Sequence, residues 1–153
     1  MTVPFRPLPM AYVAERLSPS LLTLFRSMPR GEQLHGVEVC CAVEAMGYRD
    51  PDLLAAALLH DVGKRRDPPS PPERAVVVLV EHFAPRLAAR LAAREGRAWR
   101  AFRVRRLHPA WGAAMAEAAG ASPRTVALIR HHHDGALDDP LLAPLQAADE
   151  QAP

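Results

Sequence analysis

The pair of residues best suited to chemistry is His60-Asp61, at the end of the apolar run PDLLAAALLHDVGK. A buried imidazole or carboxylate without a partner is costly, and a divalent metal ion satisfies neutral imidazole nitrogen and carboxylate oxygen together. Adjacent helical residues point about 100° apart, so both side chains can meet one ion only beyond a helix end. The alternative is a hydrogen-bonded core histidine beside a capping aspartate, and the dipeptide by itself suits both interpretations.

Residues of the same kind recur near the ends of other expected helices. His35 lies early in RGEQLHGVEVCCAV, His108 begins a helix in LHPAWGAAM, and Asp149 lies late in LLAPLQAADE. The stretch LIRHHHDG adds His131, His132 and His133 at a further helix end. Only His82, in VEHFAP, falls outside this series, and we interpret it as an ordinary surface or packing residue.

The elements that must position these residues read as helices, which predicts an all-α fold, a compact single-domain helical bundle. Asp50-Pro51 and Ser122-Pro123 are typical helix starts, and four glycines are expected as helix ends. The β-branched run RAVVVLVEHF would suit a strand, but no partner strand is expected, so it is predicted as a buried helix. Helices are expected near 19–28, 31–46, 52–62, 71–95 with a break at Pro85, 98–107, 109–119, 123–133 and 138–149, with the glycine ends at Gly47, Gly63, Gly120 and Gly135.

Length and composition predict one globular domain. The chain has 153 residues, 49% hydrophobic and 24% charged, so we expect a Pro-rich arm over residues 1–18 and a helical domain over 19–150. Neither a secretory signal nor a membrane-spanning run is evident, so a cytoplasmic protein without a membrane partner is expected. The adjacent Cys40 and Cys41 are interpreted as small buried hydrophobic residues.

The order of these motifs resembles the HD superfamily of metal-dependent phosphohydrolases, whose pattern is H…HD…D on a helical bundle. The resemblance runs from about residue 31 to 150, with AALLHDVGK matching the central motif and LQAADE the terminal Ala-Asp. It implies an HD-type fold and a divalent transition metal, one or two ions of Fe, Mn, Co, Ni or Zn. The implied ligands are His35, His60, Asp61 and Asp149.

Two more histidines suggest a second ion. His108 and His132 fall where extra ligands occur in the HD-GYP cyclic-dinucleotide phosphodiesterases and the bacterial diadenosine tetraphosphatases, which implies a binuclear centre bridged by Asp61. His133 corresponds to a further ligand only in the first group, and with Asp61 and Lys64 it is a candidate catalytic residue. After HHHDG the chain continues ALDDPLL without Gly-Tyr-Pro, and it lacks the His-Thr followed by Gly of the second group. The substrate of neither group is therefore carried over.

The resemblance implies an enzyme that hydrolyses a phosphoester or phosphoanhydride of a nucleotide or a related small phosphate compound. The alternative is a catalytically idle HD domain that senses a nucleotide or binds a protein partner. Lys64, the single lysine beside 18 arginines, either approaches a substrate phosphate or is a solvated cation at a helix end. The oligomeric state is not indicated by the sequence.

The segment 86–106 carries eight arginines against one glutamate. It would suit nucleotide phosphates, nucleic acid or an anionic membrane. The simpler interpretation is a solvated helical stripe with Leu87 and Leu91 turned inward. We favour this interpretation and do not expect a nucleic-acid partner. The stripe consists of Arg86, Arg90, Arg94 and Arg97.

Overall fold

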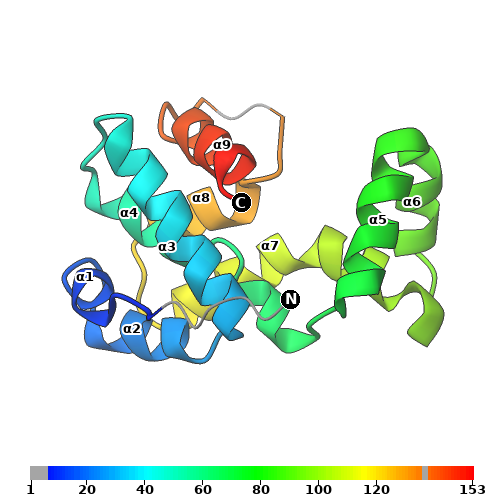
Figure 1. Ribbon diagram of the computed structural model, residues 1–153, viewed down its shortest axis with the longest axis horizontal. Helices are drawn as coiled ribbons and strands as arrows, with labels where there is room; N and C mark the ends of the chain where they lie inside the picture. The colour runs from blue at the N-terminus through cyan, green and yellow to red at the C-terminus, as the bar shows by residue number, and fades with distance from the viewer. Residues whose placement is uncertain (1–6, 136–137) are drawn as a thin grey trace.

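The computed structural model describes residues 7–135 and 138–153, and over these residues all regular secondary structure is helical, which confirms the predicted all-α bundle (Figure 1). In chain order the elements are α1 (Met10–Ala14), α2 (Pro19–Arg26), α3 (Arg30–Ala45), α4 (Pro51–Leu59), the 3₁₀ turn η1 (Val62–Arg66), α5 (Pro71–Phe83), α6 (Pro85–Ala92), the 3₁₀ turn η2 (Arg97–Trp99), α7 (Arg100–Ala118), α8 (Pro123–His131) and α9 (Leu142–Gln151).

Capping side chains fix where the site-bearing helices begin. The Asp50 carboxylate accepts hydrogen bonds from the backbone N–H groups of Asp52 and Leu53, and the Ser122 hydroxyl accepts one from Thr125 N at 3.0 Å. Both caps are followed by proline at the first helical position, as predicted. These two starts set the register of α4 and α8, which carry histidines at their C-terminal ends.

Helix α4 is the central helix of the main bundle. Every residue from Leu53 to Leu59 is buried, which explains why this segment is apolar on all sides rather than on one face. Helices α3 and α8 pack on it, and α9 and the C-terminal half of α7 contribute to the same core. The end of α4 is thus held on several sides, and it is the point from which His60 and Asp61 emerge.

Helix α7 corrects one expectation. The sequence predicted two helices, 98–107 and 109–119, but residues 100–118 form one helix of 19 residues with Pro109 inside it. A proline there has no N–H to donate to the carbonyl four residues earlier, so one helical hydrogen bond is lost. The helix continues because it is anchored by burial on both sides of Pro109, at Val104 and His108 before it and at Gly112 and Ala113 after it.

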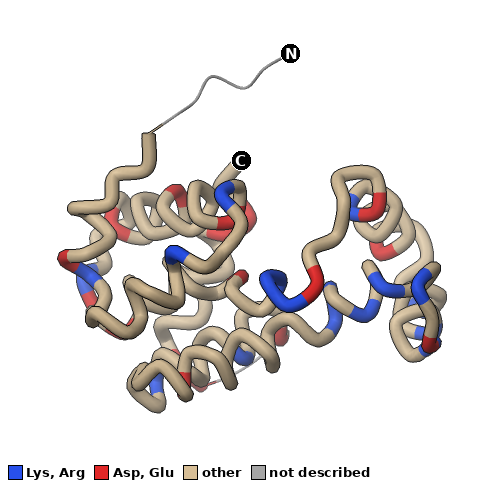
Figure 2. Tube along the Cα trace, turned by 90° about the horizontal axis from the view of Figure 1, so that it is seen from below, with Lys and Arg blue, Asp and Glu red and all other residues tan. Residues whose placement is uncertain are grey.

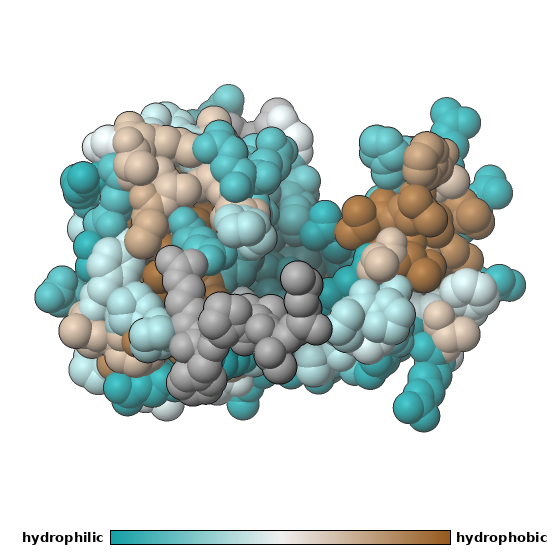
Figure 3. Space-filling view, in the orientation of Figure 1, coloured by the Kyte–Doolittle hydropathy of each residue, from teal (hydrophilic) through white to brown (hydrophobic). Residues whose placement is uncertain are grey.

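Helices α5 and α6 form a hairpin that packs on the N-terminal half of α7, apart from the main bundle (Figure 1). Its core is a separate small cluster that includes Val77, Ala88 and Phe102. The prediction of a helix at 74–83 is correct, but its burial is wrong, because Val77 is the single buried residue of α5. Leu87 likewise does not turn inward and is 47% exposed. The hairpin is too small to bury these side chains, and Figure 3 shows an apolar surface over it.

Smaller corrections concern Cys41 and Gly63. Cys41 is exposed while Cys40 is buried, as expected for neighbours about 100° apart on a helix. Gly63 does not end a helix in the left-handed conformation that Gly47 and Gly120 adopt. It lies in η1, a basic turn between the bundle and the hairpin (Figure 2).

Two further observations concern the ends of the chain and its hydrophobicity. Helix α1 lies in the predicted N-terminal arm, and Val13 in it is fully buried in the main core. Residues 1–6 are outside the described part, so the division at residue 18 stays a prediction.

No helix in the described ranges has the length and hydrophobicity needed to span a membrane.

Candidate metal centre

The His-Asp pair lies at the end of α4, in the interior of the bundle. His60 is the residue at which α4 ends, and Asp61 leaves the helical path with φ −95° and ψ 5°. The two residues are 1% and 3% exposed. Because the chain turns here, the two side chains converge despite being adjacent, with His60 Nε2 at 3.5 Å from Asp61 Oδ2. The sequence predicted that the two side chains could meet only beyond a helix end, and they do so here.

A first group of ligand-type atoms lies on one side of Asp61. His35 from α3 and Asp149 from α9 approach His60 across the core. Asp149 Oδ1 lies 2.9 Å from His35 Nε2 and 3.3 Å from His60 Nε2. Their ligand atoms all lie within 4.8 Å of one another, so these three residues could hold one metal ion.

A second group lies on the other side. His108 comes from the middle of α7, while His132 and His133 follow the end of α8. His108 Nε2 and His132 Nε2 are 3.3 Å apart, and His133 joins them within 4.8 Å. Three imidazoles from two elements thus form a second place for a metal ion.

Asp61 stands between the two groups, with one carboxylate oxygen toward each. Its Oδ2 lies 3.9 Å from His35 Nε2 and 3.5 Å from His60 Nε2, on the side of the first group. Its Oδ1 lies 3.2 Å from His108 Nε2 and 4.0 Å from His132 Nε2, on the side of the second. All six predicted ligands therefore lie together, although they come from five separate segments of the chain.

Backbone carbonyls orient three of the imidazoles. The Nδ1 atoms of His60, His108 and His132 lie 2.9, 3.1 and 2.6 Å from the carbonyl oxygens of Ala57, Val104 and Ile129. An imidazole that donates from Nδ1 keeps a lone pair on Nε2. All three Nε2 atoms could therefore act as metal ligands, since outer hydrogen bonds orient ligating histidines in this way.

Unsatisfied polar atoms show that the donor set fits a cation. His60 Nε2 is buried and makes no hydrogen bond to any described residue. His108 Nε2 and His132 Nε2 lie 3.3 Å apart, and only one of them could donate a hydrogen bond to the other. A buried polar atom without a partner is costly, and a cation in each group would satisfy these nitrogens.

The electrostatics of the first group also favour a cation. Burial alone raises the pKa of Asp61, but His60 and His108 outweigh it and hold this pKa well below its usual value. Burial likewise opposes ionisation of Asp149, and His35 and His60 lower its pKa overall. The two carboxylates in turn raise the pKa of His60 against the effect of burial. Both aspartates are ionised, and their negative charge attracts a proton or a metal ion.

His132 and His133 of the second group are held neutral. The pKa of His132 is well below its usual value because of burial and because His60 and His133 lie beside it. The ring of His133 packs against His108 and His132, and this partial burial with the nearby Arg105 guanidinium lowers its pKa to about 4. Neutral imidazoles are the form that binds metals.

Gly63 allows α7 to approach the HD motif. A Cβ atom at Gly63 would lie 1.9 Å from the carbonyl oxygen of His108 and 2.7 Å from the amide nitrogen of Gly112. The turn η1 and α7 therefore touch backbone to backbone, which only a glycine permits. This contact brings His108 to Asp61.

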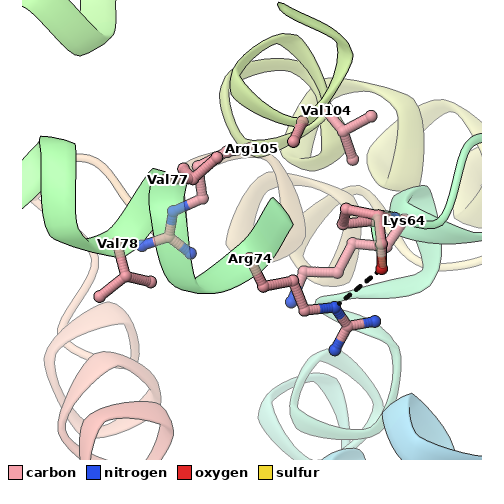
Figure 4. A pocket seen from close by; sticks show the side chains of 8 residues that line it. Lys64, Arg74, Val77, Val78, Val104 and Arg105 are labelled. Carbon is pink, nitrogen blue, oxygen red and sulfur yellow. Dashed lines mark hydrogen bonds between the residues drawn. The ribbon is translucent and has the colours of Figure 1, made fainter. Parts of the chain in front are cut away.

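Cations and one further carboxylate border the first group. Lys64 Nζ lies 2.5 Å from Asp61 Oδ2 and 3.4 Å from Glu32 Oε2, and Glu32 in turn pairs with Arg74 at 2.7 Å. Figure 4 shows Lys64, Arg74 and Arg105 around a cavity of about 120 Å³ with valine walls. Sequence reasoning missed Glu32, which is 3% exposed and precedes His35 by three residues. That helical spacing was the available signal.

Arg105 is the second residue that sequence reasoning missed. Its Nη1 lies 3.3 Å from His133 Nε2, and its Nε donates to Glu81 at 3.1 Å. It stands on α7 one turn before His108, on the helix that the sequence had divided. By contrast, His82 is exposed and outside both groups, as predicted.

Histidines and aspartates from five segments meet at the end of the central helix, so this all-α bundle has side chains that could hold a metal ion. The chain matches the family model of the HD domain over residues 8–151 and belongs to this family. HD domains bind divalent metals, and the family generally consists of metal-dependent hydrolases. Comparisons with curated proteins and with solved structures gave no match.

Proposed function

We propose that this protein is a phosphohydrolase with a binuclear metal centre. The observation that carries the proposal is the position of Asp61, whose Oδ2 faces one group of ligand atoms and whose Oδ1 faces another. A carboxylate between two sets of neutral or anionic donors is suited to bridging two cations. A domain with one ion would not need the second set.

Each ion would have its own set of side chains besides Asp61. The first would be held by His35, His60 and Asp149, and the second by His108, His132 and His133. Imidazole and carboxylate ligands favour Fe, Mn, Co, Ni or Zn. The sequence suggested His133 as a catalytic residue. We add it to the ligands of the second ion, because its ring nitrogen lies within 4.8 Å of the ligand atoms of His108 and His132.

Two divalent ions at such a centre would supply an activated water and neutralise negative charge on the phosphoryl group. The protein's own contribution is to hold the ligands in a buried frame and to offer cations at its edge. Lys64 and Arg105 border the first and second groups, and we expect them to bind phosphoryl oxygens. A small phosphate compound, such as a nucleotide, is the expected substrate.

The test is a phosphate-release screen of metal-loaded protein over nucleotides, dinucleoside polyphosphates and cyclic dinucleotides. His60→Ala should lower the rate of phosphate release by more than about 100-fold, because it removes a proposed metal ligand that is buried and held in a fixed orientation. The matched control is His82→Ala, which removes an exposed histidine outside the site and should leave the rate unchanged. Binding of a nucleotide with no hydrolysis in any metal form would favour the idle sensor instead.

A further inference from the structure

Arg105 and His133 also border a hollow that the proposed reaction does not use. Its volume is about 630 Å³, within the range of roughly 300–1,000 Å³ typical of small-molecule sites. It is bounded by α6, by α7 and by the end of α8, and we call it the α6–α8 groove. Figure 3 shows the molecule hollowed between the main bundle and the hairpin. The groove adjoins the second ligand group, because His133 belongs to both.

The groove has an apolar floor. Ala88 and Ala92 of α6 lie on one side, and Phe102 and Pro109 of α7 on the other. All four are buried or nearly so, so the floor is fixed by packing in the hairpin and in α7. Such a surface suits a flat ring, which loses water on binding without leaving polar atoms unpaired.

The rim of the groove is cationic. Arg106 and Arg130 line it, both are exposed, and neither side chain has a hydrogen bond or ion pair within residues 7–135 and 138–153. The two carboxylates at the same rim are already engaged, Glu81 by Arg105 and Asp134 by His131. The free charge in the groove is therefore positive.

We propose that the α6–α8 groove binds the part of the substrate that is not cleaved, and that this part carries a second anionic group followed by a planar ring. Arg106 and Arg130 bind the second anionic group, and the Phe102 side of the floor contacts the ring. The proposal rests on the proposed function for the place of the reacting phosphate, next to His133. A groove of this kind would favour elongated organic phosphates over simple phosphomonoesters as substrates.

The test is equilibrium binding of two probes, adenosine 5′-diphosphate and inorganic phosphate. Wild-type protein should bind the diphosphate at least about tenfold more tightly than phosphate. The double variant Arg106→Ala/Arg130→Ala should weaken diphosphate binding at least about tenfold through lost charge-assisted hydrogen bonds. Ala89→Trp, which fills the groove from an exposed position on α6, should weaken it without removing charge.

The charge-matched control is Arg86→Ala/Arg90→Ala, which removes two exposed arginines from the same hairpin outside the groove lining. It should leave the affinity unchanged, and unfolding temperatures should show that all variants are folded. The binding series is repeated in the Asp61→Ala background. The order of affinities among the variants should be the same there, even if the protein binds no metal and hydrolyses nothing. A failure of the proposed function is thus distinguished from a failure of this proposal. Equal affinity for the two probes, or an unchanged affinity in both groove variants, would overturn the proposal.

Discussion

Replacing Gly63 with alanine tests the contact that joins the HD motif to α7. The added Cβ would start 1.9 Å from the His108 carbonyl oxygen, and ordinary contact begins at 3.4 Å, so η1 and α7 must separate by about 1.5 Å. Both neighbours are backbone, so no side chain can move aside. Overpacking of this kind costs about 3 kcal/mol or more, which corresponds to a fall in Tm of roughly 6–12 °C for a chain of this size.

The assay is thermal and urea unfolding followed by circular dichroism, with chelator present so that metal binding does not contribute. Gly31→Ala is the matched control, since a Cβ at Gly31 in α3 has no neighbour within 4 Å and should be neutral or stabilising by up to about 1 kcal/mol. Because a shift of about 1.5 Å exceeds the roughly 0.5 Å tolerance of a functional site, Gly63→Ala should also bind less metal. Equal Tm values for the two variants would refute the close backbone contact.

Three further predictions concern stability. Ser122→Ala removes the cap that accepts from Thr125 N and should cost about 1 kcal/mol in urea unfolding, whereas an unchanged midpoint would mean that the cap is not formed. Hydrogen bonds from Ser70 and then Arg100 lower the pKa of Glu73 to about 2, so its stabilisation is complete above the ordinary carboxyl pKa and is lost as the pH falls. The Tm difference between wild type and Glu73→Gln should therefore be full at pH 6 and shrink toward pH 2, and a constant difference would contradict it. Chelation of bound metal should lower the Tm, and added Mn²⁺ should restore it, because a ligand of the native state stabilises that state; a Tm indifferent to chelator would argue against a metal in the native fold.

Much of the fold could be predicted because its signals are local. Asp50-Pro51 and Ser122-Pro123 mark helix starts through side chains within three residues of the backbone groups that they cap. The wrong boundary at Pro109 and the wrong burial of α5 share a cause. In each case packing against distant segments decides where the helix ends or which residues are buried. The intrinsic preferences of neighbouring residues contain no information on that packing.

The convergence of the predicted ligands could be anticipated because an ordered pattern of histidines and aspartates is visible in one dimension; their role as ligands stays a prediction. Glu32 and Arg105 could not be found in this way. Glu32 meets Lys64 across 32 positions, and Arg105 meets His133 across 28. In a chain with 18 arginines, only the folded structure distinguishes those that border the site, such as Arg74 and Arg105.

Metal content per chain tests the central claim most directly. Protein purified without chelator and loaded with Mn²⁺ or Fe²⁺ should contain two ions per chain, measured by mass spectrometry of the metal. His35→Ala and His108→Ala should each retain about one ion, because each damages one ligand group, while His82→Ala should retain two. Asp61→Ala should lose affinity at both positions. One ion in the wild type, or an unchanged content in His108→Ala, would contradict a centre that Asp61 bridges.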